Sequence, residues 1–308
     1  MSSHQYSIAV LIPCYNEGVA IAGVVNAFRA ALPGALIYVY DNNSTDDSVN
    51  QAQQAGAIVR VESMQGKGHV IRRMFADVEA DLYVMVDGDA TYPAEEAPKL
   101  IEHLLTHQLD MMVGARVPEE GAHRPKHEFG NSFFNTVVSR LFGQGLHDIF
   151  SGYRVFTRRF VKSFPAVSSG FEIETELSVH ALDARIPYSE VQVPYLARPE
   201  GSESKLNTYN DGSLILLTVL KLYAQIKPFK LFGWCSVLLL VASLILGYPL
   251  IFTWLQTGLV PRIPTAIIVM GLLVFAFLSL ACGILLEGVT QARRENRRLH
   301  YLRLPQIQ

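Results

Sequence analysis

The chain has 308 residues, of which 50% are hydrophobic and 18% charged, and its formal net charge at pH 7 is -2. This near balance of charge excludes a protein held to nucleic acid by a strong overall positive field. The length leaves room for one α/β domain and additional segments.

Short apolar runs alternate with helical patterns over the first 114 residues. We expect strands at residues 8–12, 36–40, 58–61, 82–86 and 109–114. Helices are expected at residues 19–31 and 93–106, and two more follow the polar stretches 41–47 and 65–68 and end at about residues 54 and 78. Strands separated by helices are typical of a mostly parallel sheet with right-handed crossovers. Ligands of such open sheets bind beyond the carboxyl ends of the strands. The loops after these strands are therefore the expected functional site.

An acidic pair follows the strand at residues 82–86: Asp87 and Asp89, separated by Gly88. Two carboxylates this close repel by roughly 4 kcal/mol at an effective dielectric constant of about 20, and a divalent cation would remove that repulsion. Hard oxygen ligands suit Mg²⁺ or Mn²⁺, which are usually shared with substrate phosphates. The alternative is an acidic turn in which the glycine supplies the bend.

Polar residues also follow the earlier strands. Asp41 can accept hydrogen bonds from a base or a ribose, or it can cap the next helix, and Glu17 has the same two interpretations. Gly66-Lys67-Gly68 has neither the third glycine of G-x-G-x-x-G nor the spacing of G-x-x-x-x-G-K-[ST]. A flexible turn with a solvated lysine is the alternative at this point.

The pattern is looser after residue 114. We expect a polar loop at residues 117–128, a helix at 129–142, a helix from residue 171 and an edge strand at 189–196. A loop of that length inside a compact domain is usually functional or mobile. The helix from residue 171 begins with three alternating acids, Glu172, Glu174 and Glu176, which usually indicate a solvated face although one of them can face the cleft.

Two runs without a charged residue, 231–255 and 265–286, stand near the end of the chain. As helices they would span about 37 and 33 Å, enough to cross a hydrocarbon core about 30 Å thick. Two buried core helices are the alternative. Basic residues flank the pair: Lys221, Lys227, Lys230, Arg293, Arg294, Arg297, Arg298 and Arg303. Because basic residues favour the cytoplasmic side, this placement predicts a multi-pass protein of the inner (cytoplasmic) membrane, with the soluble domain and both termini cytoplasmic.

These observations divide the chain into four parts. We expect a soluble α/β domain over residues 1–206, an interfacial amphipathic helix over 207–230, a transmembrane hairpin over 231–287 and a basic cytoplasmic tail over 288–308. A polar loop carrying Arg198 and Lys205 lies directly before the interfacial segment. The substrate is therefore expected to carry a lipid phosphate. Two spans are compatible with a monomer or a homo-oligomer.

Six motifs in order resemble the family-2 inverting glycosyltransferases of the GT-A fold, and among them the dolichol-phosphate mannosyltransferase-like enzymes. The motifs are Ile12-Pro13-Cys14-Tyr15-Asn16-Glu17, Asp41-Asn42-Asn43-Ser44-Thr45-Asp46, Gly66-Lys67-Gly68, Asp87-Gly88-Asp89, Ser151-Gly152-Tyr153-Arg154 and Gly201-Ser202-Glu203-Ser204-Lys205-Leu206. The two-span tail is similar to that of bacterial members that glycosylate polyprenyl phosphate. The resemblance implies transfer of a sugar, with inversion, from a nucleotide-diphosphate sugar to polyprenyl (undecaprenyl or dolichyl) phosphate, with Mg²⁺ or Mn²⁺ and without nucleic acid.

The same resemblance implies roles for individual residues. The donor would contact Pro13, Tyr15, Glu17, Asp41, Lys67, Asp87, Gly88 and Arg116. Asp87 and Asp89 would hold the metal, and Asp89, Asp148 and Arg198 would be catalytic. The acceptor would contact Ser151, Arg154, Arg198, Ser204 and Lys205. The chain departs from the family pattern at Thr91, where many relatives carry glutamine, and at Asn42-Asn43, where Asp-Gly is usual, which leaves the base open.

Three other functions compete with this interpretation: a processive polysaccharide synthase, a nucleotidyltransferase and a non-catalytic lipid-phosphate-binding membrane scaffold. The synthases carry a Gln-x-x-Arg-Trp motif, whereas both tryptophans here, Trp234 and Trp254, fall in the uncharged runs. A phosphate monoester is largely ionised at pH 7, so transfer to it requires no strong general base.

Overall fold

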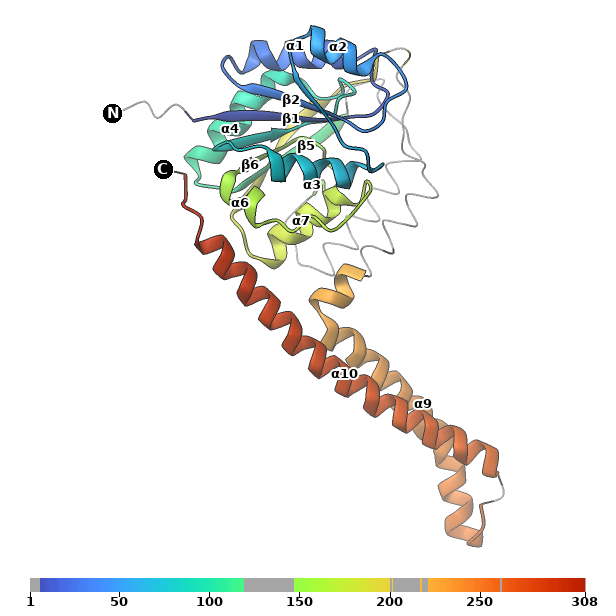
Figure 1. Ribbon diagram of the computed structural model, residues 1–308. Helices are drawn as coiled ribbons and strands as arrows, with labels where there is room; N and C mark the ends of the chain where they lie inside the picture. Colours follow the sequence, from blue (N-terminus) through green and yellow to red (C-terminus); the bar gives the residue numbers. More distant parts are fainter. Residues whose placement is uncertain are drawn as a thin grey trace. The chain divides into compact units, whose positions relative to one another are not determined.

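A computed structural model describes residues 6–118, 147–199, 201, 217, 221–260 and 262–307 (Figure 1). The chain forms two compact units, Met1–Val219 with Arg297–Gln308, and Leu220–Asn296. The helix predicted at 129–142, most of the interfacial helix predicted at 207–230, and Ser204 and Lys205 lie outside the described residues.

The first unit is built on a seven-stranded sheet in the order β3-β2-β1-β4-β6-β5-β7. Its strands are β1 (Ile8–Cys14), β2 (Leu36–Asp41), β3 (Ile58–Val61), β4 (Leu82–Met85), β5 (Met111–Pro118), β6 (Arg154–Thr157) and β7 (Tyr188–Tyr195). Only β6 runs antiparallel to its neighbours, β4 and β5. The prediction of a mostly parallel α/β sheet is confirmed. β6 was not predicted, because it has only two apolar residues, Val155 and Phe156, between a charged and a polar side chain.

Helices cover both faces of this sheet (Figure 1). They are α1 (Ile21–Ala31), α2 (Ser48–Gln54), α3 (Lys67–Asp77), η1 (Ala94–Glu96), α4 (Ala97–Thr106), α6 (Arg158–Ser163) and α7 (Ile173–Asp183). Alternate residues of β1 and β4 pack with α1, α2 and α4 in one apolar core. Aromatic rings fill the other face, where Phe75 of α3 lies 5.7 Å from Phe156 of β6, between ring centroids.

The topology brings several chain segments to one edge of the sheet. Cys14 at the end of β1 pairs with Asp41 at the end of β2, and Met85 at the end of β4 pairs with Arg154. Because β6 runs in the opposite direction, the loop before Arg154 lies at the same edge as the carboxyl ends of β1, β2 and β4. The later part of β5 and the segment after β7 reach this edge as well, since Val113 pairs with Arg154 and β7 is parallel to β5.

The last residues of the chain pack on the first unit at the opposite edge, where β5 begins. Tyr301 donates a hydrogen bond to Asp110, whose Oδ2 also lies 2.6 Å from Arg159 Nη2. Thr157 Oγ1 donates to Asp110 Oδ1 at 2.6 Å. The Arg159 guanidinium lies 4.3 Å from the centre of the Tyr301 ring. The residues from Arg297 onward therefore belong to the first unit.

The second unit contains α9 (Pro228–Thr257) and most of α10 (Ile263–Leu302), whose last residues, from Arg297, belong to the first unit. Ser279 Oγ of α10 donates to the Phe232 carbonyl of α9 at 2.9 Å, so the two helices lie side by side. Both are long and apolar enough to cross a membrane. In the most apolar 18-residue stretch of each helix, only 17% and 11%, respectively, is buried. Their apolar side chains are therefore not covered by the chain itself as those of core helices are. The predicted pair of candidate membrane helices is confirmed.

Candidate active site

Asp89 lies at the centre of a charged cluster beyond the end of β4. Asp89 is only 4% exposed. Thr91 donates to Asp89 Oδ1 twice, from its hydroxyl at 2.6 Å and from its backbone N–H at 3.2 Å. Arg198 Nη2 lies 2.5 Å from the other oxygen, Oδ2. Burial and the neighbouring charge of Asp87 raise the pKa of Asp89, and the opposing effects of Arg198 and Thr91 do not cancel that rise.

Asp87 shares one buried cation with a distant acid. Lys67 Nζ, at the start of α3, lies 2.5 Å from Asp87 Oδ1 and 2.5 Å from Oε1 of Glu174 on α7. Burial alone would lower the pKa of Lys67, but the charges of Asp87 and Glu174 outweigh burial and raise it. Burial raises the pKa of Glu174. The lysine side chain is only 11% exposed, so the alternative of a solvated lysine is wrong.

The acidic run at the start of α7 is not a solvated face. Glu174 and Glu176 are both buried. Glu176 accepts hydrogen bonds from the backbone N–H groups of Val167 and Ser168. Glu174 faces the charged cluster and Glu176 anchors the preceding loop, which corrects the interpretation of the alternating acids as an exposed pattern.

Glycines allow the close approach of these segments. A side chain on Gly152 would overlap the carboxylate of Asp87, and one on Gly68 would overlap the Ser168 carbonyl. Gly66 has a φ of 132°, a region that other residues rarely adopt. The glycines of the Ser-Gly-Tyr-Arg and Gly-Lys-Gly motifs therefore have a steric explanation, and Gly152 in particular sets the position of Asp87.

A second ion pair lies at the same edge, between Arg116 of β5 and Asp148. Arg116 Nε and Nη2 each donate to Asp148, to Oδ2 and Oδ1, at 2.7 Å. Burial would raise the pKa of Asp148, but the hydrogen bonds and charge of Arg116 outweigh burial and lower it. Asp148 is thus an ionised anchor that fixes the orientation of Arg116.

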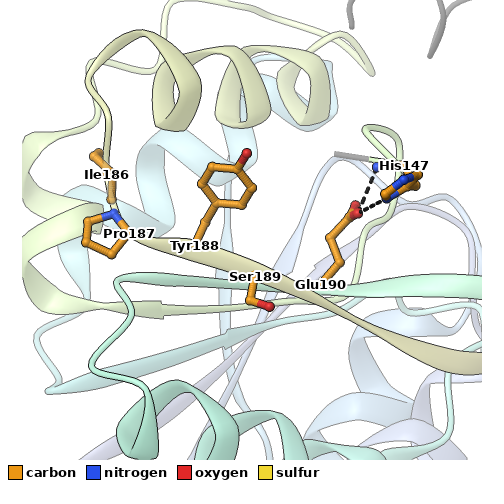
Figure 2. A pocket seen from close by; sticks show the side chains of 6 residues that line it. All are labelled: His147, Ile186, Pro187, Tyr188, Ser189 and Glu190. Atoms are coloured by element: carbon orange, nitrogen blue, oxygen red, sulfur yellow. Dashed lines mark hydrogen bonds and ion pairs between the residues drawn. The ribbon is translucent and has the colours of Figure 1, made fainter. Parts of the chain in front are cut away.

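Glu190 of β7 holds this anchor in turn, and sequence reasoning missed it. Its Oε1 accepts from the backbone N–H of Asp148 at 3.1 Å, and Oε2 accepts from the N–H of His147 at 2.7 Å. Glu190 and His147 line a pocket of about 540 Å³ along β7, together with Ile186, Pro187, Tyr188 and Ser189. Figure 2 shows these six side chains. None of the predicted site residues lines this pocket.

Asp41, at the end of β2, has a buried oxygen without a partner. Its Oδ2 accepts a hydrogen bond from Ser44 N at 3.2 Å, whereas Oδ1 has no partner among the described residues. The N-cap of α2 is Asp47, so the interpretation of Asp41 as that cap is wrong. A buried acceptor is costly to leave unsatisfied, so Oδ1 suits a ligand N–H or O–H. Tyr15, in the loop after β1, is 38% exposed at this edge.

Two residues predicted to contact the acceptor lie beneath the site instead. Arg154 is 0% exposed and donates to the backbone carbonyls of Ser151 and Ile149 at 2.9 and 2.8 Å. Ser151 is also 0% exposed and donates to the Gly114 carbonyl at 2.6 Å. They hold the loop between Asp148 and β6 rather than facing the charged cluster, because this loop must turn directly into a buried strand.

Arg198 occupies a different position from that expected of a residue turned toward an acceptor. Besides its contact with Asp89, its Nη1 lies 3.9 Å from Glu17 Oε1. The structure therefore brings Glu17, Lys67, Asp87, Asp89 and Arg198 into one cluster of alternating charge. Among the described residues, no group of three His, Cys, Asp or Glu side chains is arranged to hold a metal ion.

This sheet order, with carboxylates beyond β4 and a buried acceptor beyond β2, defines a GT-A-like fold. The solved structure of glucosyl-3-phosphoglycerate synthase from Mycobacterium tuberculosis with Mn²⁺, UDP and glucosyl-3-phosphoglycerate matches with a TM-score of 0.60 and 21% identity, over 71% of this chain and 81% of that chain. Another complex of that enzyme contains Mg²⁺ and UDP.

Sequence comparison gives the family. The Glycosyl transferase family 2 pattern matches residues 9–164. Glycosyltransferase AglJ of Haloferax volcanii is 32% identical over 292 residues, covering 94% of this chain and 95% of its own. A dolichyl-phosphate hexose transferase of the same organism is 26% identical over 215 residues, covering 70% of this chain and 92% of its own. The chain belongs to glycosyltransferase family 2.

Proposed function

We propose that this glycosyltransferase moves a hexose, with inversion, from a nucleotide-diphosphate sugar to polyprenyl phosphate, undecaprenyl or dolichyl, at the cytoplasmic face of the inner membrane. The observation that carries the proposal is the cluster of Asp87, Asp89, Lys67 and Arg198, in a chain that also has two candidate membrane helices. The similarity to a dolichyl-phosphate hexose transferase supports the acceptor class.

The donor side fits a nucleotide diphosphate with Mg²⁺ or Mn²⁺. Asp87 and Asp89 offer hard carboxylate oxygens, and such sites use one or two carboxylates together with substrate phosphates. When bound, the cation would act as a Lewis acid toward the leaving diphosphate. Asp41 Oδ1 accepts a hydrogen bond from the base or the ribose, with Tyr15 and Pro13 beside it and Glu17 in reach of the ribose. Lys67 holds Asp87 in position, and Gly88, between the two carboxylates, packs closely against Ile12 and Ile21.

The acceptor side is assigned to basic residues that come shortly before the second unit in the sequence. Arg198, with Ser204 and Lys205 further along the chain, holds the phosphate of the lipid. The guanidinium forms charge-assisted hydrogen bonds with phosphate and offsets the repulsion between two anionic substrates. The basic residues on either side of the apolar helices favour a cytoplasmic location for the first unit and both termini.

Direct displacement requires no strong base here. The phosphate oxygen of the acceptor is largely ionised at pH 7 and attacks the anomeric carbon as the bond to the diphosphate breaks. Asp148 therefore acts through Arg116, which it orients toward the donor. Its lowered pKa and bidentate contact with Arg116 favour this anchoring role over proton transfer.

The experiment uses the full chain purified in detergent. It is supplied with UDP-, GDP- and dTDP-sugars in turn, polyprenyl phosphate and Mg²⁺ or Mn²⁺, and the lipid-linked sugar is quantified. We expect one donor to react, and we expect Asp89→Asn to reduce the rate by at least about 100-fold, as loss of a major electrostatic contact does. Asp77→Asn, which changes a carboxylate paired with Arg73 on α3, is the matched control.

Three results would reject the proposal. One is full activity of Asp89→Asn in the presence of a chelator, which removes the metal role. Another is the absence of transfer together with the absence of binding of any sugar nucleotide, which favours the non-catalytic scaffold. Long polysaccharide products instead of a single transferred sugar would favour the processive synthase.

A further inference from the structure

The contact between Arg198 and Asp89 joins two residues assigned to different substrates. Asp89 is assigned to the metal of the donor, and Arg198 to the phosphate of the acceptor. In the structure Arg198 Nη2 lies 2.5 Å from Asp89 Oδ2. Asp89 and Arg198 cannot both bind their assigned ligands while this ion pair is intact.

The geometry of Asp89 identifies the oxygen for which Arg198 and a divalent cation would compete. Oδ1 accepts hydrogen bonds from the backbone N–H and the hydroxyl of Thr91. A carboxylate oxygen has two lone-pair positions, so these two donors use the capacity of Oδ1. Oδ2 is therefore the oxygen that a divalent cation would bind, and it is the one that Arg198 contacts.

A cation on Oδ2 would lie beside the Arg198 guanidinium. Like charges this close in a site with little solvent repel strongly, because Asp89 is 4% exposed and the Arg198 side chain 25% exposed. Arg198 has a second carboxylate in reach, Glu17 Oε1 at 3.9 Å. It stands in a segment with no regular secondary structure after β7, where a side chain can move without disturbing the sheet.

We infer that Arg198 is an internal counter-ion of Asp89, which the divalent cation displaces and thereby releases toward the acceptor phosphate. This inference rests on the proposed function. It predicts an order of binding, in which metal and donor come first and make Arg198 available to the lipid phosphate. It also gives Thr91 a purpose, because Thr91 leaves Oδ2 as the single oxygen for which Arg198 and the cation compete.

The test is the affinity for Mn²⁺ alone, measured by electron paramagnetic resonance on the full chain in detergent without nucleotide or lipid. Arg198→Gln removes the competing charge while Asp89 remains. We expect it to bind Mn²⁺ at least about tenfold more tightly than the unchanged protein, which is about 1.4 kcal/mol. Arg198→Lys keeps a positive charge beside Asp89, so its affinity for Mn²⁺ should stay within about threefold of that of the unchanged protein. Arg158→Gln, which disrupts an ion pair with Glu79 on the surface, is the control for loss of an arginine.

A residue with a merely structural role would give the opposite sign, because loosening the site weakens metal binding. Unchanged or weaker Mn²⁺ binding in Arg198→Gln, with binding lost in Asp89→Asn, overturns the inference and leaves the proposed function standing. Should Arg198→Gln fail to fold, Arg198→Ala and Arg198→Lys carry the same comparison. Binding of Mn²⁺ that Asp89→Asn does not weaken overturns the metal assignment and this inference with it.

Discussion

Replacing Lys67 by methionine tests the buried charge cluster directly. Lys67 lies between Asp87 and Glu174, 2.5 Å from each, and Glu174 is 4% exposed. Without the lysine, Glu174 would be a buried carboxylate without its cation, and it would take up a proton rather than remain charged.

The cost of that proton sets the size of the effect. A glutamate with an ordinary pKa of about 4.3 in the unfolded chain costs about 4 kcal/mol to protonate at pH 7.5, and about 1.5 kcal/mol at pH 5.5. The variant therefore binds more protons when folded than when unfolded, so its loss of stability grows as the pH rises. A unit of this size shifts its melting temperature by about 2–4 °C per kcal/mol, so we expect a fall of about 8–16 °C at pH 7.5.

The assay is thermal unfolding in detergent at both pH values, followed by circular dichroism. The double variant Lys67→Met with Glu174→Gln removes the unpaired carboxylate and should recover at least half of the loss in melting temperature. Lys99→Met, at an exposed ion pair with Glu96, is the control and should change stability by at most about 0.5 kcal/mol. An equal fall at both pH values, or no recovery in the double variant, would refute the reasoning.

Three further predictions use other parts of the first unit. Gly152→Ala should displace Asp87 and reduce transfer at least about 100-fold with the fold intact by circular dichroism; an active variant would show that the position of Asp87 is not critical. Burial lowers the pKa of His180 to about 4, with a smaller effect of Arg297. The unfolded chain therefore binds more protons than the folded chain between about pH 4 and 6.5. The free energy of unfolding should fall by up to about 3 kcal/mol on acidification through this range. His180→Phe should flatten that dependence in thermal melts, and an unchanged slope would contradict it. Tyr301→Phe removes a hydrogen bond to buried Asp110 and should cost about 1.5–3 kcal/mol by the same melts, whereas an unaltered melting temperature would show that the contact contributes nothing.

Much of the fold and part of the candidate site could be predicted from local pattern. Apolar runs followed by polar loops located β1, β2 and β4, and the rule that parallel strands present their ends at one edge brought Asp41, Asp87 and Asp89 to the same place. The two apolar helices were evident from the lack of charge alone. These features depend on residues close together in the sequence.

The remainder depends on contacts between distant segments, for which the sequence has no local signal. Lys67 and Glu174 are more than one hundred residues apart, and nothing near either shows that they share a contact with Asp87. The burial of Arg154 follows from the antiparallel strand that it begins, and that strand has only two apolar residues, too few to indicate a strand. Thr91 differed from the residue expected of the family, yet its hydroxyl binds Asp89 directly.

The return of the chain to its starting unit constrains how many times it can cross a bilayer. Residues before 220 and residues after 296 belong to one compact body, closed by the contacts of Tyr301. A chain that leaves a folded body on one side of a lipid bilayer and returns to it must cross the bilayer an even number of times. An odd number of crossings, shown by labelling the two ends of the chain from opposite sides of sealed vesicles, is incompatible with this closure.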